Sequence, residues 1–299
     1  MQSETLAYKM QPAGHEEPPK RRNYAPNKKL EEAFETWLGS ILPDENMLPL
    51  YNRAEYAVQN IDASVEEAHA LLLAYENYPK VDLAGLFVSA IYNKLPEKII
   101  NFDIDLDFFL THTGYNLPLG KTLIATGKNA KWLGEYAKGT ILNYSPGLLE
   151  TGVWSSGLVI NYAQSNDPDF TKNSAGVAIN LGNIRNFNIT GRTGYLLDFS
   201  QVDTGDLIER KVMAEDILRD RRSNNYVERN NFIIEHMMTH EHKMIPELWE
   251  YLQQLKQLLE PGKDDYKKAL AAVETLGQEP AKTIKTTINE LFKRRGYDV

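Results

Sequence analysis

The spacing of apolar residues divides this chain into a helical region, a region of strands and a second helical region. From Asn27 to Asn93 apolar side chains recur every three or four residues, as they do along one face of an α-helix. After Pro96, short runs of β-branched and aliphatic residues alternate with Gly, Asn, Ser and Pro, which is typical of strands separated by turns. From Asp206 onward the helical spacing returns. The pattern predicts an α+β fold in the order helices, strands, helices.

The first helical region has its own start and stop signals. Its first helix has one apolar face, formed by Leu30, Phe34, Trp37, Leu38 and Ile41. Ser64 and Glu67 have the spacing of a capping box, in which each side chain bonds the backbone of the other residue. A further helix is predicted from Asp82 to Asn93, because Pro96 cannot continue it. We expect residues 28–96 to cap one end of the strand region.

Five glycines recur through the strand region at intervals of 19, 18, 19 and 18 residues. Each begins a strand-like run, as in "GTILNY" and "GLVINY". The five are Gly120, Gly139, Gly157, Gly176 and Gly194. A period this short leaves no room for a crossover helix, which needs about ten residues or more. The repeat predicts a short right-handed parallel β-solenoid over residues 97–203, with 18–19 residues in each coil.

Equivalent residues of neighbouring coils stack about 4.8 Å apart in such a fold. The third residue after each glycine is aliphatic, and we assign this column to the interior: Leu123, Leu142, Ile160, Ile179 and Leu197. The fourth residue is Ile124 in the first coil and is polar in the later coils. We therefore predict a hydrogen-bonded ladder formed by Asn143, Asn161 and Asn180 and ending at Asp198. Each glycine is expected at a corner, where a side chain would collide with the next coil.

Two segments, "WLGEYAKGTILNY" and "ETGVWSSGLVINY", are similar to a known repeat. They resemble the GXGXG repeat domain, the β-helix at the C-terminus of the glutamate synthase large subunit and in a subunit of formylmethanofuran dehydrogenase. The matching glycines lie five residues apart, Gly134 with Gly139 and Gly152 with Gly157. The resemblance covers Gly114 to Ser200, with Thr171 in place of the next glycine and Gly191/Gly194 as the last pair. It implies a spacer and docking scaffold rather than a reaction centre.

The regions outside the strands are predicted to be a tail and a helical C-terminus. Residues 1–27 are poor in apolar side chains, so we expect a flexible tail whose "PPKRRN" is a solvated linker. Residues 204–299 are expected to be helical, with Gly262, Gly277 and Gly296 as stops.

One predicted C-terminal helix begins at Pro246 and has a single apolar stripe. The stripe consists of Leu248, Trp249, Leu252, Leu255 and Leu259. It must be buried, either on the solenoid as a cap or in an interface with a protein partner or a second copy of the chain. Partner binding or self-association through the C-terminal helices is therefore expected.

Composition narrows the range of partners. The chain has 299 residues and a formal net charge of −8, which disfavours binding to nucleic acid or to an anionic membrane. The absence of cysteine excludes disulfides, cysteine nucleophiles and cysteine-ligated metal centres. No apolar run has the length of a membrane span or of a signal peptide, so we expect a cytoplasmic protein.

Three of the six histidines cluster in one segment, "EHMMTHEH". His236 and His240 are four residues apart and would share one helix face, so with His242 and a neighbouring glutamate they could bind a divalent metal. The general-base glutamate of the H-E-x-x-H motif is missing. An ordinary polar helix end is the competing interpretation.

Three further segments contain charged residues that could form a binding or catalytic site. "RDRR" (Arg219 to Arg222) is interpreted as a solvated helix end, because neighbouring acids neutralise it. "GYNLPLGK" (Gly114 to Lys121) lacks the Walker spacing of a phosphate-binding loop. Asp103, Asp105 and Asp107 alternate along a strand and could face a cleft.

These observations favour a non-enzymatic scaffold for protein interaction, with no cofactor. The alternatives are an accessory subunit of an oxidoreductase complex and a metal-dependent hydrolase that uses His236, His240 and His242.

Overall fold

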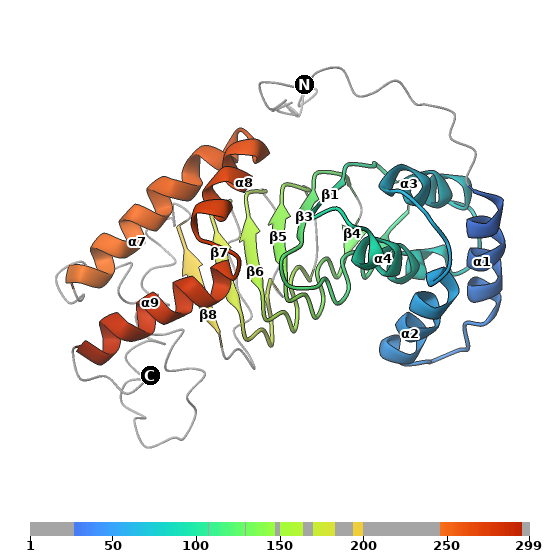
Figure 1. The fold of residues 1–299 in the computed structure, drawn as a ribbon, viewed down its shortest axis with the longest axis horizontal. Helices are drawn as coiled ribbons and strands as arrows, with labels where there is room; N and C mark the ends of the chain where they lie inside the picture. Colours follow the sequence, from blue (N-terminus) through green and yellow to red (C-terminus); the bar gives the residue numbers. More distant parts are fainter. Residues whose placement is uncertain are drawn as a thin grey trace, which may run out of the picture.

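The computed structural model describes residues 27–106, 108–128, 130–146, 150–163, 170–182, 194–199 and 246–294. Within these ranges a parallel β-solenoid lies between two groups of helices, as the sequence predicts (Figure 1). The tail before Asn27, the helices predicted over residues 204–245 and the stop at Gly296 lie outside the described residues. None of the described helices combines the length and the apolar character that crossing a bilayer requires.

The N-terminal helices form the first part of the core. They are α1 (Lys28–Gly39), α2 (Met47–Val58), α3 (Val65–Ala74), the 3₁₀ helix η1 (Val81–Leu83) and α4 (Ala84–Lys94). The predicted capping box is confirmed at the start of α3. The Ser64 hydroxyl accepts from the Glu67 N–H, and the Glu67 carboxylate accepts from the Ser64 N–H. The predicted apolar face of α1 is buried, and this core continues into the solenoid interior.

The main sheet consists of parallel four-residue strands, one from each coil. They are β1 (Ile99–Phe102), β3 (Thr122–Ala125), β5 (Thr140–Asn143), β6 (Leu158–Asn161), β7 (Val177–Asn180) and β8 (Tyr195–Asp198), in that spatial order. A second parallel pair, β2 (Leu110–Thr111) with β4 (Ala130–Lys131), joins the first coils on another side. Parallel neighbours separated by one repeat are the defining feature of a β-solenoid.

Four of the five repeat glycines stack as predicted, and Gly120 does not. Thr140 pairs with Thr122, so Gly139 lies beside Lys121 instead. Gly157 shows why the column needs glycine, because a Cβ there would lie 1.9 Å from the carbonyl oxygen of Gly139. Gly120 has a φ of +82° and lies in the turn before β3, so its left-handed backbone is the reason for glycine at that position. The predicted equivalence is wrong by one residue in the first coil.

The solenoid interior is filled by a different column from the predicted one. It contains the second residue after each stacked glycine, Ile141, Val159, Ala178 and Leu196, in register with Leu123 and Ile100. The column assigned to the interior, Leu142, Ile160, Ile179 and Leu197, lies on the outer face of the strands, in register with Ile124 rather than Leu123. Successive side chains of a strand point to opposite faces, and here both faces are buried. Apolar character alone could not identify the inner face.

The predicted asparagine ladder is confirmed. The Nδ2 atom of Asn143 donates to Oδ1 of Asn161 (2.8 Å), and Asn161 donates in the same way to Asn180 (2.9 Å). Asn180 Nδ2 donates to Oδ1 of Asp198 (2.9 Å), so the ladder ends at an acceptor. The first coil has Ala125 in this column, not Ile124. The three asparagines are buried, where an amide without a hydrogen bond would be costly.

The C-terminal helices cover the outer face of the sheet. They are α7 (Pro246–Leu259), the 3₁₀ helix η3 (Glu260–Lys263), α8 (Tyr266–Thr275) and α9 (Pro280–Arg294), and they lie along the β6 to β8 part of the solenoid (Figure 1). Leu248, Leu252, Leu255 and Leu259 of the predicted stripe are buried in one core with the outer strand column. These four leucines therefore pack on the solenoid, which is the cap alternative, and the Trp249 side chain lies outside the described part of the structure.

The repeated tyrosines of "GTILNY" and "GLVINY" join the sheet to these helices. The rings of Tyr144 and Tyr162 are stacked, with centroids 4.7 Å apart and planes 11° apart. The Tyr144 hydroxyl donates to the carbonyl of Gly262 (2.7 Å), and the Tyr162 hydroxyl donates to the carbonyl of Leu259 (3.1 Å). A Cβ at Gly262 would lie 2.6 Å from the Tyr162 hydroxyl, so glycine permits this close approach.

Removing one amide from the ladder should destabilise the whole protein. Asn161→Ala leaves the Asn143 amide, the Asn180 carbonyl oxygen and the Ala163 carbonyl without their partner. We expect the free energy of unfolding to fall by about 3 kcal/mol or more, measured by chemical denaturation. Asn52→Ala, at an exposed position of α2, is the matched control and should change stability by less than about 0.5 kcal/mol. Equal effects of the two substitutions would show that the ladder does not contribute to stability.

Stability should fall in alkaline solution. Burial raises the pKa of Tyr195 to about 12 and raises the pKa of Tyr162 above its usual range. Because the folded-state pKa lies above that of the unfolded chain, the contribution is complete below about pH 10 and is lost as the pH rises toward about 12. Denaturation at increasing pH should show this loss together with tyrosinate absorbance. Tyr162→Phe should make the loss shallower, whereas Tyr56→Phe, at a side chain 80% exposed, should not. A stability that stays constant over this pH range would contradict the prediction.

Candidate functional site

Among the described residues, four successive coils have a turn segment in which alternate residues are left-handed. The φ values lie between 51° and 75°. These residues are His112, Gly114 and Asn116, then Trp132, Gly134 and Tyr136, then Glu150, Gly152 and Trp154, and finally Thr171 and Asn173. The turn segments bond one another through the backbone, for example Gly134 N–H to the Thr113 carbonyl (2.8 Å) and Gly152 N–H to the Leu133 carbonyl (2.7 Å). Left-handed residues other than glycine are uncommon, so their regular recurrence is a built feature of the solenoid.

The middle position of each turn segment faces the inner column. A Cβ at Gly134 would lie 2.6 Å from Cγ1 of Ile141, and one at Gly152 would lie 2.8 Å from Cγ2 of Val159. In the next coil Thr171 takes the glycine position, and Ala178 takes the place of the larger aliphatic residue. The departure from the glycine repeat at Thr171 is therefore matched by a smaller inner side chain, which keeps the interior volume nearly constant.

The last position of two turn segments presents aromatic side chains to solvent. Tyr136 is 43% exposed and Trp154 is 45% exposed. Their rings are stacked, with centroids 5.4 Å apart and planes 10° apart. Their backbone N–H groups donate to the carbonyls of Val153 (3.2 Å) and Lys172 (3.0 Å) in the following coil. We call these two residues the exposed aromatic pair. Aromatic side chains already ordered in the free protein lose little entropy on binding.

A buried histidine lies in the same turn segments. His112 is 2% exposed, its Nδ1 lies 2.5 Å from Oε2 of Glu135, and its ring lies 4.5 Å from that of Trp132. The Ser89 hydroxyl of α4 donates to the His112 carbonyl (2.9 Å). A catalytic base must reach its substrate, and this imidazole is closed off by the side chains around it. The backbone carbonyl of His112 holds α4 on the first coil, and its imidazole joins two turn segments through Glu135.

A second buried histidine belongs to the junction between α3 and β1. His69 Nε2 lies 2.8 Å from the Tyr92 hydroxyl, and its Nδ1 lies 3.6 Å from Asp103. Burial lowers the pKa of His69, and the nearby Asp103 carboxylate opposes that shift.

The three aspartates predicted along one strand have different surroundings. Asp103 lies near His69, Asp105 accepts from the Lys128 N–H (3.1 Å), and Asp107 lies outside the described residues. The structure does not bring Asp103 and Asp105 together in a cleft.

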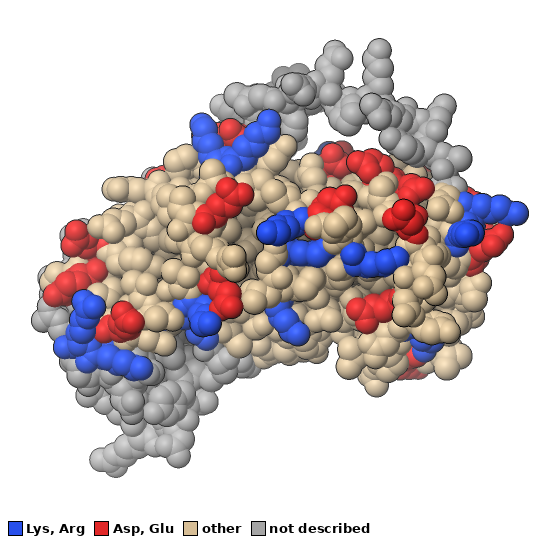
Figure 2. All heavy atoms as spheres, viewed as in Figure 1, with Lys and Arg blue, Asp and Glu red and all other residues tan. Residues whose placement is uncertain are grey.

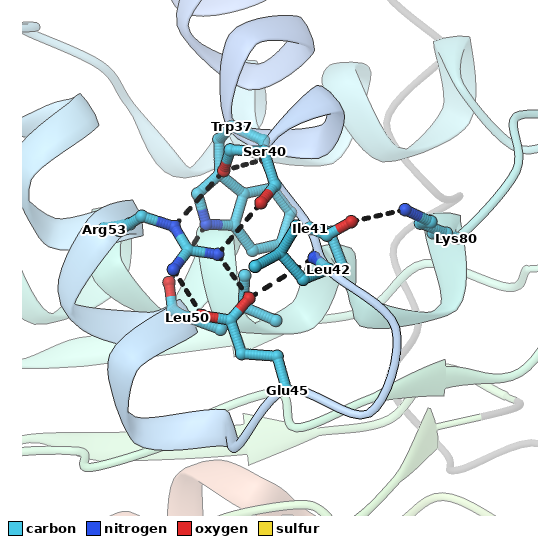
Figure 3. Close-up of polar contacts among 8 residues, drawn as sticks. All are labelled: Trp37, Ser40, Ile41, Leu42, Glu45, Leu50, Arg53 and Lys80. Atoms are coloured by element: carbon cyan, nitrogen blue, oxygen red, sulfur yellow. Dashed lines mark hydrogen bonds and ion pairs between the residues drawn. The ribbon is translucent and has the colours of Figure 1, made fainter.

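A polar network closes the loop between α1 and α2 (Figure 3). Arg53 donates to the hydroxyl of Ser40 (3.3 Å) and to its carbonyl (3.2 Å), and it forms a bidentate pair with Glu45. Lys80 donates to the carbonyl of Ile41 (2.6 Å). Hydrogen bonding to Glu45 raises the pKa of Arg53, and the same bond lowers the pKa of Glu45. These cations bond carbonyls that follow the end of α1, which is a structural role.

Lys121, the last residue of the predicted "GYNLPLGK" segment, is also used structurally. Its ammonium group donates to the carbonyls of Tyr92 (2.7 Å) and Leu95 at the end of α4. Burial lowers the pKa of Lys121. These bonds join α4 to the first coil, so the Lys121 ammonium group is used for structure rather than for binding phosphate.

The described residues include no group of three or more His, Asp or Glu side chains arranged to hold a metal ion. His236, His240 and His242 lie outside the described residues, as does the "RDRR" segment. Figure 2 shows basic and acidic side chains interspersed over the face that it displays, without a broad region of one sign. The exposed aromatic pair is therefore the candidate site that the described residues support best.

The exposed aromatic pair is not among the sites predicted from the sequence, although the sequence contains a signal for it. Tyr136 and Trp154 each lie three residues before a repeat glycine, Gly139 and Gly157. Aromatic residues at equivalent positions of adjacent coils must stack, because the coils are one strand spacing apart. Their exposure depends on what packs over the turn segments, which the spacing does not reveal.

Comparisons with known proteins found no matching family model, curated protein or solved structure.

The pairing of small and large residues across the coil can be tested by a double-mutant cycle. Gly152→Ala places a methyl group 2.8 Å from Cγ2 of Val159 and 2.9 Å from Cγ2 of Thr171 at a φ of +69°, and Val159→Ala removes the first of these contacts. We expect each single substitution to cost about 1–3 kcal/mol and the double variant to cost less than their sum by about 1 kcal/mol. Chemical denaturation of the four proteins measures this coupling. Strict additivity would show that the contact with Val159 is not a reason for glycine at position 152.

Proposed function

We propose that this chain is a non-enzymatic scaffold that binds another protein through the exposed aromatic pair. The observation that carries the proposal is the presentation of two stacked, half-exposed aromatic rings on a turn whose backbone is bonded to the next coil. Tyr and Trp are the residues that most often supply binding energy at protein interfaces.

The polar groups of the described residues support a structural rather than a catalytic role. The asparagine ladder bonds within itself, and His112, Arg53 and Lys121 bond neighbouring elements. A general acid or base would have to face a reacting group. If the partner is a larger redox enzyme, the chain is an accessory subunit of an oxidoreductase complex.

The C-terminal helices are the other surface considered for association. The buried leucines of α7 cannot serve as that surface while they pack on the solenoid. The exposed aromatic pair lies on the turn segments instead, away from this core. It is therefore the better supported contact.

The test compares three forms of the full chain at native expression level, with in-cell cross-linking before purification. These are the unmodified chain, Tyr136→Ala with Trp154→Ala, and a control with Leu48→Ala and Tyr56→Ala. The control removes another exposed apolar pair, which lies on α2. We expect one set of proteins to be cross-linked to the unmodified chain and the control and to be lost from the pair variant. For a purified partner, the Kd should rise at least about tenfold in the pair variant and stay unchanged in the control.

Two results would overturn the proposal. One is that the pair variant and the control are cross-linked to the same proteins and bind the purified partner with the same Kd. The other is a metal-dependent hydrolytic activity that His236→Ala with His240→Ala abolishes, since this would establish an enzyme.

A further inference from the structure

A line of aromatic rings connects the N-terminal helices to the exposed aromatic pair. Tyr51 of α2 lies 4.9 Å from Tyr115 in the turn segment of the first coil, measured between ring centroids. Tyr115 lies 5.5 Å from Tyr136 at an interplanar angle of 66°, and Tyr136 stacks on Trp154. Tyr51 and Tyr115 are buried, whereas the other two rings are exposed. The four rings thus form a contact path from the core to the surface.

The buried end of this path is held firmly by hydrogen bonds. The Tyr51 hydroxyl donates to Glu55 (2.9 Å) and accepts from Nδ2 of Asn93 (2.7 Å). Asn93 also donates to the carbonyl of Tyr115 (2.9 Å), and the Tyr115 N–H donates to the hydroxyl of Ser89 (3.1 Å). Two residues of α4 and one ring of α2 therefore determine where the Tyr115 ring lies.

The two exposed rings occupy the same position of adjacent coils, and the equivalent positions of the flanking coils are Asn116 and Asn173. Tyr136 contacts Tyr115 edge to face and Trp154 face to face. An edge-to-face contact such as that of Tyr115 with Tyr136 restricts ring orientation.

We propose that Tyr51 and Asn93 are positioning residues for the exposed aromatic pair, acting through Tyr115. The N-terminal helices then do more than close the end of the solenoid, because their docking on the first coil fixes the Tyr115 ring against which Tyr136 packs. Binding of a partner at the pair and docking of these helices are consequently linked, and each favours the other. The link to binding rests on the proposed function, whereas the control of ring orientation does not.

The orientation is measured by fluorine NMR of the full chain labelled with 5-fluorotryptophan. Trp154→Phe assigns the Trp154 resonance among those of the four tryptophans. The test variants are Tyr51→Leu, which removes the ring, Tyr51→Phe, which removes the hydroxyl, and Asn93→Ala. The control is Phe34→Leu, a fully buried ring of α1 whose ring contacts are Trp37, Tyr75 and Phe87.

Tyr51→Leu and Asn93→Ala should shift or broaden the Trp154 resonance, and Tyr51→Phe should have a smaller effect. Phe34→Leu should move the Trp37 resonance and leave that of Trp154 in place. An unchanged Trp154 resonance in Tyr51→Leu and Asn93→Ala, or an equal change in Phe34→Leu, would overturn the proposal. If Tyr51→Leu does not fold, Tyr51→Phe and Asn93→Ala decide the outcome.

The link to binding has its own readout. With the cross-linked partner in purified form, the Kd should rise about three- to tenfold in Tyr51→Leu and stay unchanged in Phe34→Leu. A shifted Trp154 resonance with an unchanged Kd would retain the positioning role and reject the link. Failure of the pair variant to lose any partner would reject the proposed function and leave the NMR result as the test of positioning.

Discussion

The hydrogen-bonded column of Asn143, Asn161 and Asn180 is the constraint on which the rest of the structure depends. Each amide donates to the next coil, and Asn161 and Asn180 also accept from the coil before, which is possible only when the coils align residue for residue. A slip by one residue would leave buried amides without partners. With the register held in this way, small and large residues meet across each coil, as Gly152 and Val159 do.

The sheet divides the molecule into two cores with different neighbours. The inner column belongs to one core with the N-terminal helices, and the outer column belongs to another with α7, α8 and α9. Helices are joined to the solenoid through specific groups, namely Ser89 and Asn93 at the first coil and the hydroxyls of Tyr144 and Tyr162, which follow β5 and β6. The N-terminal helices lie at the β1 end of the sheet, where an uncovered edge strand could pair with another chain (Figure 1).

Both faces of β5 to β8 are buried, so among the described residues the turn segments are the part of these coils that can present side chains to solvent. Their backbone is held by bonds to the adjacent coils, so a side chain there is oriented before any partner arrives. Tyr136 and Trp154 combine this rigidity with exposure, and the buried ring of Tyr115 connects them to the N-terminal helices. In the described residues, the proposed binding site and the structural integrity of the solenoid therefore depend on the same stacked arrangement.

The sequence by itself determined the order of helices and strands, the solenoid period and the asparagine ladder, because these features depend on spacing along the chain. It did not determine which strand face is inside, since the columns of Ile141 and Leu142 are both aliphatic and both buried. Tertiary structure also decided that the α7 leucines pack on the sheet and that Tyr136 and Trp154 remain exposed. Burial of a given side chain depends on which other element lies against it, and residues far apart in the chain supply that element.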